Sequence, residues 1–175
     1  MLIVGENLQT LMNQKQIAAA ALYDVTSIRV QLGDSVSWPN SSGVTIGLDD
    51  VDFDSHYVEQ DISRSILTLE PGAAVLACSQ HRYTIPLGYF GTVHTKGTLA
   101  RLFVSIHQND PQVDPGYTGR ITFEVVNSGP LTVAIKPGAD IGRLSLWRCS
   151  SDNSAPYDGR YQDANGPTIP RRPRT

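Results

Sequence analysis

The sequence predicts a mainly β protein, a sandwich or barrel of short strands preceded by one N-terminal helix. Two observations predict this class. Beyond residue 30, glycine and proline recur at short intervals, and the stretches between them are short and rich in β-branched residues. The first twenty or so residues are instead rich in Ala, Leu, Met, Gln and Lys, a composition that is typical of a helix.

The segment from Glu6 to Leu22 is expected to be the single substantial helix. Within it, Leu8, Leu11, Met12 and Ile17 are spaced to form one apolar face. The apolar start of the chain is too short for a membrane span and lacks the charged flank of a signal peptide. We therefore expect no membrane association and no export.

Four later runs alternate between apolar and polar residues, as strands do: Ser27–Gly33, Ala74–Ser79, Arg120–Gly129 and Thr132–Gly138. In the third run, Ile121, Phe123 and Val125 share one strand face. Thr122 and Glu124 share the opposite face, so the carboxylate points away from the apolar row. Periodicity alone leaves Glu124 open as either a solvated carboxylate or a site residue.

The segment from Pro39 to Ser63 is polar and reads as a variable surface loop. It contains Asp49, Asp50, Asp52 and Asp54 close together. The alternating oxygen ligands and closing glutamate of a calcium loop are absent from it, so no metal site is predicted there.

The length fits one domain, and the cysteine usage makes a reducing cytoplasm the expected compartment. The net charge is −3, and apolar and charged residues make up 40% and 18% of the 175 residues, so neither disorder nor nucleic-acid binding is expected. Cys78 and Cys149 fit no CxxC spacing, which argues against a disulfide framework and a zinc site. Residues 1–149 are expected to form the domain. Residues 150–175 are expected to be a tail that becomes ordered over a ligand.

A longer motif runs from Thr95 to Pro130, TKGTLARLFVSIHQNDPQVDPGYTGRITFEVVNSGP. It resembles the dCTP deaminase family pattern, GRSSLARLGL followed after a spacer by IDPGWxGxIxLEFxNSGP. Further matches lie at Leu69–Ala77, Ile85–Val93, Ile135–Leu146 and Tyr157–Arg171. The resemblance implies a distorted jelly-roll or β-barrel of the dUTPase-like type. It also implies a homotrimer with nucleotide sites between subunits.

The resemblance further implies hydrolytic deamination of dCTP to dUTP and ammonia, by a zinc-independent hydrolase acting on a cyclic amidine. Zinc deaminases need HxE and PCxxC elements, and neither occurs here. Glu124 occupies the position of the family's catalytic base, with Thr122 and Phe123 beside it in the substrate-binding strand. Asp114 aligns with an aspartate that contacts deoxyribose, although a Pro-Gly turn would favour the same residue. His107 is left open between orienting a catalytic group and a structural role.

The phosphate-binding segment implied by the resemblance is Lys96, Gly97, Thr98, Leu99, Ala100 and Arg101. Cationic side chains and backbone N–H groups can neutralise and orient a polyphosphate, and Arg101 is the cation that the pattern retains. Gly97 replaces a serine of the pattern and removes a hydroxyl from the implied site. Mg²⁺ is expected to arrive with the triphosphate, without a metal site on the protein.

The tail resembles the family's lid, YxGKYQGQxGPTxSR. The implied substrate-binding positions are Tyr157, Arg160, Tyr161, Gln162 and Ala164, the last standing where the pattern has glutamine. An ordered tail could exclude water from a bound nucleotide.

Two other functions stay open at this point. One is a dUTP diphosphatase with Asp114 positioning water, although the glycine-rich, phenylalanine-containing C-terminal motif of those enzymes is lacking. The other is a catalytically impaired nucleotide-binding or regulatory homologue, motivated by Gly97, Gln112 and Ala164. Whether a deaminase would continue to dUMP and pyrophosphate also stays open. The expected partner is a deoxynucleoside triphosphate, dCTP with dUTP as the second candidate, and neither nucleic acid nor a membrane.

Overall fold

The computed structural model describes residues 1–40, 43, 45–47, 53–151 and 155–171. Its helical elements are α1 (Gly5–Lys15), η1 (Ala20–Leu22), η2 (Asp54–His56) and α2 (Gly97–Arg101). Its strands are β1 (Tyr23–Asp24), β2 (Ser27–Pro39), β3 (Tyr57–Asp61), β4 (Leu67–Leu69), β5 (Ala74–Thr84), β6 (Tyr89–Thr95), β7 (Val104–Ser105), β8 (Gln112–Val113), β9 (Thr118–Asn127), β10 (Val133–Ile135) and β11 (Asp140–Arg148).

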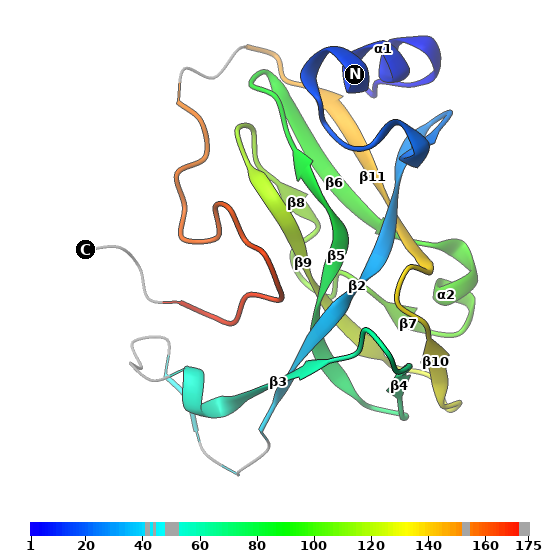
Figure 1. The fold of residues 1–175 in the computed structure, drawn as a ribbon, viewed down its shortest axis with the longest axis vertical. Helices are drawn as coiled ribbons and strands as arrows, with labels where there is room; N and C mark the ends of the chain where they lie inside the picture. Colours follow the sequence, from blue (N-terminus) through cyan, green and yellow to red (C-terminus); the bar gives the residue numbers. More distant parts are fainter. Residues whose placement is uncertain (41–42, 44, 48–52, 152–154, 172–175) are drawn as a thin grey trace.

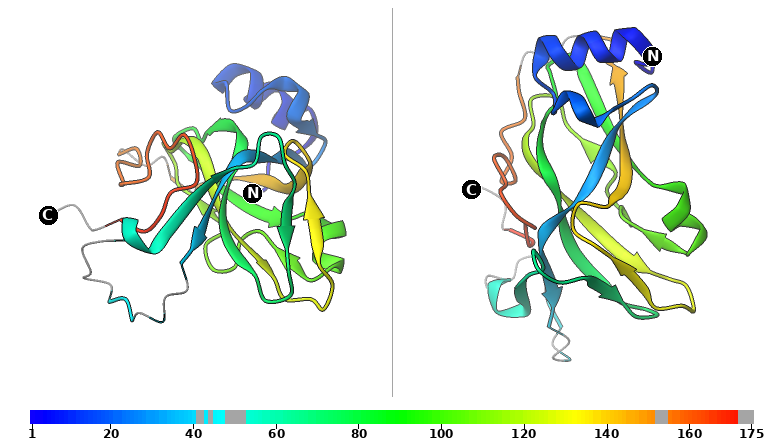
Figure 2. Two further views of the ribbon diagram at one scale, coloured as in Figure 1. Left: turned by 60° about the horizontal axis from the view of Figure 1, so that its bottom comes forward. Right: turned by 45° about the vertical axis from the view of Figure 1, so that its right-hand side comes forward.

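One curled antiparallel sheet makes up most of the molecule (Figures 1 and 2). Its strand order is β7-β9-β5-β2-β11-β6-β8, with β1 and β3 paired to further lengths of β2. A small second sheet pairs β10 with β4. The curl produces a half-barrel, with α1 at one end of it (Figure 2). The predicted mainly β class with a short N-terminal helix is confirmed.

Strand β9 has the two faces that its periodicity predicts. Ile121, Phe123 and Val125 are buried in the core, whereas Thr122 and Glu124 are half-buried on the other face. Strand β9 pairs with β5 in antiparallel fashion, with Phe123 opposite Ala77 and Glu124 opposite Leu76. A long, well-paired strand therefore fixes where the Glu124 carboxylate points.

The N-terminal helix is shorter than predicted. It ends at Lys15 because Gln16 adopts a left-handed conformation, φ 51°, and its N–H caps the Met12 carbonyl. The expected helix through Leu22 is thus wrong in its last turns, where only η1 is helical. The apolar face itself is confirmed, since Leu8, Leu11, Met12 and Ile17 are all buried. None of the described helices is long and apolar enough to cross a membrane.

The prediction of a surface loop from Pro39 to Ser63 is wrong for its second half. Strand β3 lies there and pairs with the end of β2, Val36 opposite Gln60. Its side chains are mostly exposed, so it carries no hydrophobic alternation from which a strand could be inferred. Asp54 begins η2, whereas Asp49, Asp50 and Asp52 lie outside the described residues.

Candidate active site

A cavity of about 380 Å³ lies beside the polar face of β9, between that strand, the loop before it and the C-terminal tail. The residues that line it are Tyr57, Leu76, Val93, His107, Asp110, Pro111, Gln112, Val113, Asp114, Tyr117, Ile121, Thr122, Phe123, Glu124, Tyr157, Tyr161, Thr168 and Pro170. The cavity therefore brings together seven of the predicted catalytic and substrate-binding residues: His107, Asp114, Thr122, Phe123, Glu124, Tyr157 and Tyr161.

The Glu124 carboxylate is held at one oxygen. Its Oε2 accepts a 2.7 Å hydrogen bond from the backbone N–H of Asn109. The backbones of Glu124 and His107 also form an isolated parallel β-bridge. These contacts fasten the loop after β7 to the strand that carries the carboxylate. The group is thus oriented beside the cavity while remaining half-buried.

The His107 imidazole is harder to protonate than that of a solvent-exposed histidine. Burial lowers its pKa below the usual value, and the neighbouring His94 lowers it further, against a smaller opposing effect of Glu124. The two histidine rings meet edge to face, 6.1 Å apart between centroids. A neutral ring beside a carboxylate can donate one hydrogen bond and accept another without adding charge to the cavity.

Asp114 lies in the Pro-Gly turn that leads into β9. The turn is closed by a 3.1 Å hydrogen bond from the Tyr117 N–H to the Asp114 carbonyl. The Tyr117 ring is buried, and its hydroxyl donates to the Arg120 carbonyl at 2.7 Å. Burial also raises the pKa of the Tyr117 phenol. The turn therefore has a rigid base, and the Asp114 side chain lies on the exposed rim of the cavity.

The described part of the tail supplies another wall of the cavity. Tyr157 packs edge to face on Tyr117, with 5.8 Å between ring centroids. Thr168 donates its backbone N–H to the Thr122 hydroxyl at 3.0 Å, and that hydroxyl donates to the Thr168 hydroxyl at 3.1 Å. Thr122 was expected to bind substrate, and here it also joins β9 to the tail.

The segment from Lys96 to Arg101 lies elsewhere. Gly97–Arg101 form α2, which is on the opposite side of the half-barrel from the tail (Figures 1 and 2). None of Lys96, Gly97, Thr98, Leu99, Ala100 and Arg101 lines the cavity of the same subunit. Leu99 is buried, while Arg101 is exposed and donates to the Gly97 carbonyl at 2.9 Å. The fold does not join this cation to Glu124 within one chain.

Three tail residues that were predicted to bind substrate do not line this cavity. Gln162 bonds the backbone around it, accepting from the Thr118 N–H at 2.9 Å and donating to the Gly116 carbonyl at 3.0 Å. The Ala164 carbonyl accepts from the Arg120 N–H at 2.8 Å. The Arg160 guanidinium lies over the Tyr161 ring, 5.8 Å from its centroid.

Sequence reasoning missed Tyr57 and Thr168 as cavity residues. Tyr57 begins β3, inside the segment expected to be a loop, and burial raises the pKa of its phenol. No local signal in the sequence singles it out. Thr168 stands in the Gly-Pro-Thr motif of the tail, and the match of that motif to the lid pattern was the available signal.

The described residues do not assemble a protein metal centre. Among them, no three His, Cys, Asp or Glu side chains gather into a group that could hold a metal ion. Asp110, Asp114 and Glu124 all line the cavity, but they do not form such a group.

A family model described as dCTP deaminase-like matches residues 2–149. Among curated relatives, a dCTP deaminase, dUMP-forming, of Corynebacterium jeikeium is 37% identical over 105 residues, covering 57% of this chain and 56% of the relative. A protein of the same description from Acidothermus cellulolyticus is 36% identical over 127 residues, covering 65% of this chain and 66% of the relative. The chain thus matches little more than half of the length of the Corynebacterium relative.

Among solved structures, the 2'-deoxycytidine 5'-triphosphate deaminase of Agrobacterium tumefaciens has a similar fold. Its TM-score is 0.62 at 14% sequence identity, over 83% of this chain and 47% of that chain. At this identity the likeness establishes the fold alone.

Proposed function

Since the chain belongs to the dCTP deaminase-like family, we propose that it hydrolyses the 4-amino group of dCTP, forming dUTP and ammonia. The observation that carries the proposal is the placement of the Glu124 carboxylate on the cavity wall, beside His107 and in the same cavity as Asp114. The names of the relatives, dCTP deaminase and dCTP deaminase, dUMP-forming, support the substrate.

The proposed chemistry needs one carboxylate that moves protons. Glu124 accepts a proton from water as the water oxygen adds to C4 of the cytosine ring, and passes that proton to N3. The second proton of the water then moves to the amino nitrogen as the C4–N bond breaks. Ammonia leaves, the carbonyl of uracil forms, and Glu124 returns to its starting state. The fixed Asn109 contact at one carboxylate oxygen leaves the other oxygen for this exchange.

The other cavity residues have proposed binding roles. Asp114 at the rim contacts the deoxyribose, and Thr122 and Phe123 frame the base. Tyr157 and Tyr161 close the cavity from the tail, which we assign to residues 150–175 as a lid over the domain formed by residues 1–149. Gln162 contributes by fixing the backbone of the lid, and His107 by orienting Glu124 through the loop that joins them.

Lys96–Arg101 are proposed to bind the triphosphate in the cavity of a neighbouring subunit of a homotrimer. The position of α2 across the half-barrel from its own cavity supports this arrangement, as does the exposed Arg101 guanidinium. Arg160 and the backbone at Ala164 add to the same polyphosphate site from the lid. A site divided between subunits would make assembly a condition of turnover.

Mg²⁺ is proposed to enter bound to the triphosphate oxygens. When bound, it supplies charge neutralisation to the polyphosphate, and the residues around the cavity are left to orient sugar and base. The cytoplasm is the proposed compartment, which agrees with Cys78 and Cys149 both being free.

The direct test incubates the purified chain with Mg²⁺ and each of dCTP and dUTP, then quantifies ammonia, pyrophosphate and the nucleotide products. Ammonia release from dCTP is expected, and pyrophosphate release distinguishes a dUMP-forming enzyme. Glu124→Gln is expected to lower ammonia release by at least about 100-fold, because the amide keeps the Asn109 contact but cannot accept the proton. Glu70→Gln, an exposed carboxylate beyond β4, is the matched control. Turnover of dUTP alone would instead favour the diphosphatase, and tight binding without turnover the impaired homologue suggested by Gly97, Gln112 and Ala164.

The shared site has its own test. Arg101→Gln and Glu124→Gln are each expected to be inactive alone, and to regain activity when unfolded and refolded together. In a randomly mixed trimer, about a quarter of the sites would combine an intact Arg101 with an intact Glu124 from the adjacent subunit. No recovery in confirmed mixed trimers would contradict the division of the site.

A further inference from the structure

The tail runs along the strand that carries Glu124. The Asp163 N–H donates to the Thr118 carbonyl at 2.8 Å, and the Arg120 N–H donates to the Ala164 carbonyl at 2.8 Å. With the Thr168 N–H bonded to the Thr122 hydroxyl at 3.0 Å, the tail contacts β9 at successive positions along the strand. The tail is therefore docked on the domain by its backbone as well as by side chains.

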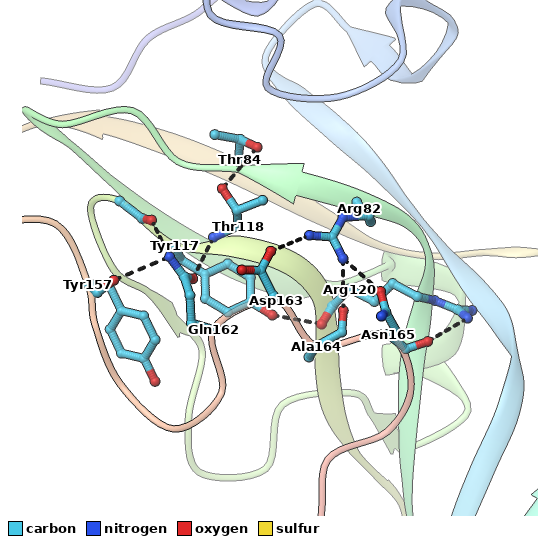
Figure 3. Close-up of polar contacts among 11 residues, drawn as sticks. Arg82, Thr84, Tyr117, Thr118, Arg120, Tyr157, Gln162, Asp163, Ala164 and Asn165 are labelled. Carbon is cyan, nitrogen blue, oxygen red and sulfur yellow. Dashed lines mark hydrogen bonds and ion pairs between the residues drawn. The ribbon is translucent and has the colours of Figure 1, made fainter. Parts of the chain in front are cut away.

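Two arginines fasten this part of the tail from outside the cavity (Figure 3). The Arg82 guanidinium donates to the Asp163 carboxylate at 2.6 Å and to the Asn165 side-chain oxygen at 2.7 Å. Arg120 donates to the Asn165 carbonyl at 3.1 Å and, through its other terminal nitrogen, to Asp34 at 2.7 Å. We call Arg82, Arg120, Asp163 and Asn165 the tail clasp.

The clasp includes an unusual backbone position. Asp163 has φ 59°, in the left-handed region that favours glycine and that aspartate tolerates better than most residues. The lid pattern that the tail resembles has glycine at this position. Aspartate thus retains the chain reversal and adds a carboxylate directed at Arg82, so the position anchors the tail as well as turning it (Figure 3).

Along the tail, the anchored residues lie between residues that line the cavity. Tyr157, Tyr161 and Thr168 line the cavity, while Asp163 and Asn165, between them in sequence, face the two arginines. Neither Arg82 nor Arg120 lines the cavity. An effect of the clasp on a bound nucleotide would therefore act through the tail.

We propose that Arg82 and Asp163 are positioning residues, whose ion pair keeps the tail docked as a wall of the cavity and thereby sets substrate affinity rather than the rate of the chemical step. The kinetic part of this inference rests on the proposed function, whereas the docking of the tail does not. If the tail is docked in only a fraction of the molecules, the apparent dissociation constant equals the intrinsic constant divided by that fraction.

The strength of the pair sets the size of the effect. The Arg82 and Asp163 side chains are 43% and 72% exposed, so solvent and salt screen their attraction. Loss of the pair should increase the undocked fraction by only about threefold to fivefold at low salt. The remaining backbone bonds should keep most molecules docked.

Hydrogen exchange of the free protein tests docking without any nucleotide. Asp163→Asn removes the charge but retains a side chain that tolerates the left-handed backbone, and Arg82→Gln removes the partner. Both are expected to speed exchange at the amides of Arg120, Asp163 and Thr168 by about threefold to fivefold, with a smaller change for Arg82→Lys. The control is Asp24→Asn, which breaks the 2.8 Å Arg143–Asp24 pair at another part of the sheet and should leave these amides unchanged. Unchanged exchange in both clasp variants, or an equal change in the control, would overturn the proposal.

Steady-state kinetics with dCTP then test positioning. Because most molecules stay docked, the clasp variants are expected to raise KM by no more than about twofold while kcat is unchanged, and the difference in KM from wild type should narrow as ionic strength increases. A fall in kcat without a change in KM would contradict positioning. Absence of turnover in the wild type would refute the proposed function instead, and the exchange measurements would still decide whether the clasp docks the tail.

Discussion

His107 and Glu124 are joined by an isolated parallel β-bridge between their backbones. The bridge connects the loop after β7 to the middle of β9, and Asn109 completes the connection by donating its N–H to the Glu124 carboxylate at 2.7 Å. Two residues that stand 17 positions apart in the sequence thus share one wall of the cavity. The loop positions the carboxylate, and the carboxylate in turn orders the loop.

Acid should destabilise the wild type more than a His107→Gln variant. Burial, with His94 beside it, lowers the pKa of His107 in the folded state, so the unfolded chain binds the proton first as pH falls. Stability is therefore lost as pH falls below the ordinary histidine pKa of about 6.5. Urea midpoints measured from pH 8 to pH 5.5 should drop further for the wild type than for His107→Gln. His56→Gln in η2 serves as the control, and parallel pH profiles for wild type and His107→Gln would refute the prediction.

Gly33→Ala should destabilise the fold and loosen the tail together. A Cβ at this position of β2 would lie 2.8 Å from the Cys78 carbonyl oxygen and against the Arg120 guanidinium. The backbone of a paired strand can move away only at a cost in energy, so a loss of about 1–3 kcal/mol in the free energy of unfolding is expected. Urea denaturation and proteolysis of the tail would measure the two effects. Gly47→Ala is the control, because a Cβ there has no neighbour within 4 Å. A Gly33→Ala protein as stable as the control would disprove the close approach.

Asn127→Ala should be among the most destabilising single changes in β9. The buried amide donates to the Leu69 and Leu131 carbonyls at 2.9 and 2.8 Å and accepts from the Gly129 N–H at 3.0 Å. Removing it leaves three backbone groups without these partners, two of them in buried hydrogen bonds, which costs about 3 kcal/mol. Equilibrium unfolding checks the value against Asn13→Ala on the exposed side of α1. A loss below about 0.5 kcal/mol would show that the turn after β9 does not depend on this side chain.

Gly97→Ser should raise turnover of dCTP without changing stability. A Cβ at the start of α2 would approach only the flexible end of Arg101, at 2.9 Å, so the free energy of unfolding should stay within about 0.5 kcal/mol. The serine restores the hydroxyl that the family pattern carries in the segment proposed to bind triphosphate. An increase in kcat is therefore expected, measured as ammonia release. Gly97→Ala separates the hydroxyl from the added bulk, and an equal effect of both variants would exclude a role for the hydroxyl.

Strand periodicity was sufficient to predict the faces of β9, because its side chains alternate between a buried and a half-buried face. It was insufficient for β3, whose pairing with β2 depends on backbone hydrogen bonds and leaves little trace in a polar, exposed sequence. The end of α1 was missed for a related reason. Helical composition continues to Leu22, but the left-handed Gln16 ends the helix at Lys15.

The sequence by itself determined the mainly β class, the outward direction of Glu124 and the family pattern around it, since these depend on neighbours along the chain. Only the tertiary structure decided that Tyr57 and Thr168 join Glu124 at one cavity, that α2 lies away from it, and that Arg82 and Asp163 meet. Such contacts join residues far apart in sequence, and their distances follow from how the sheet curls and where the tail docks, which no local pattern records.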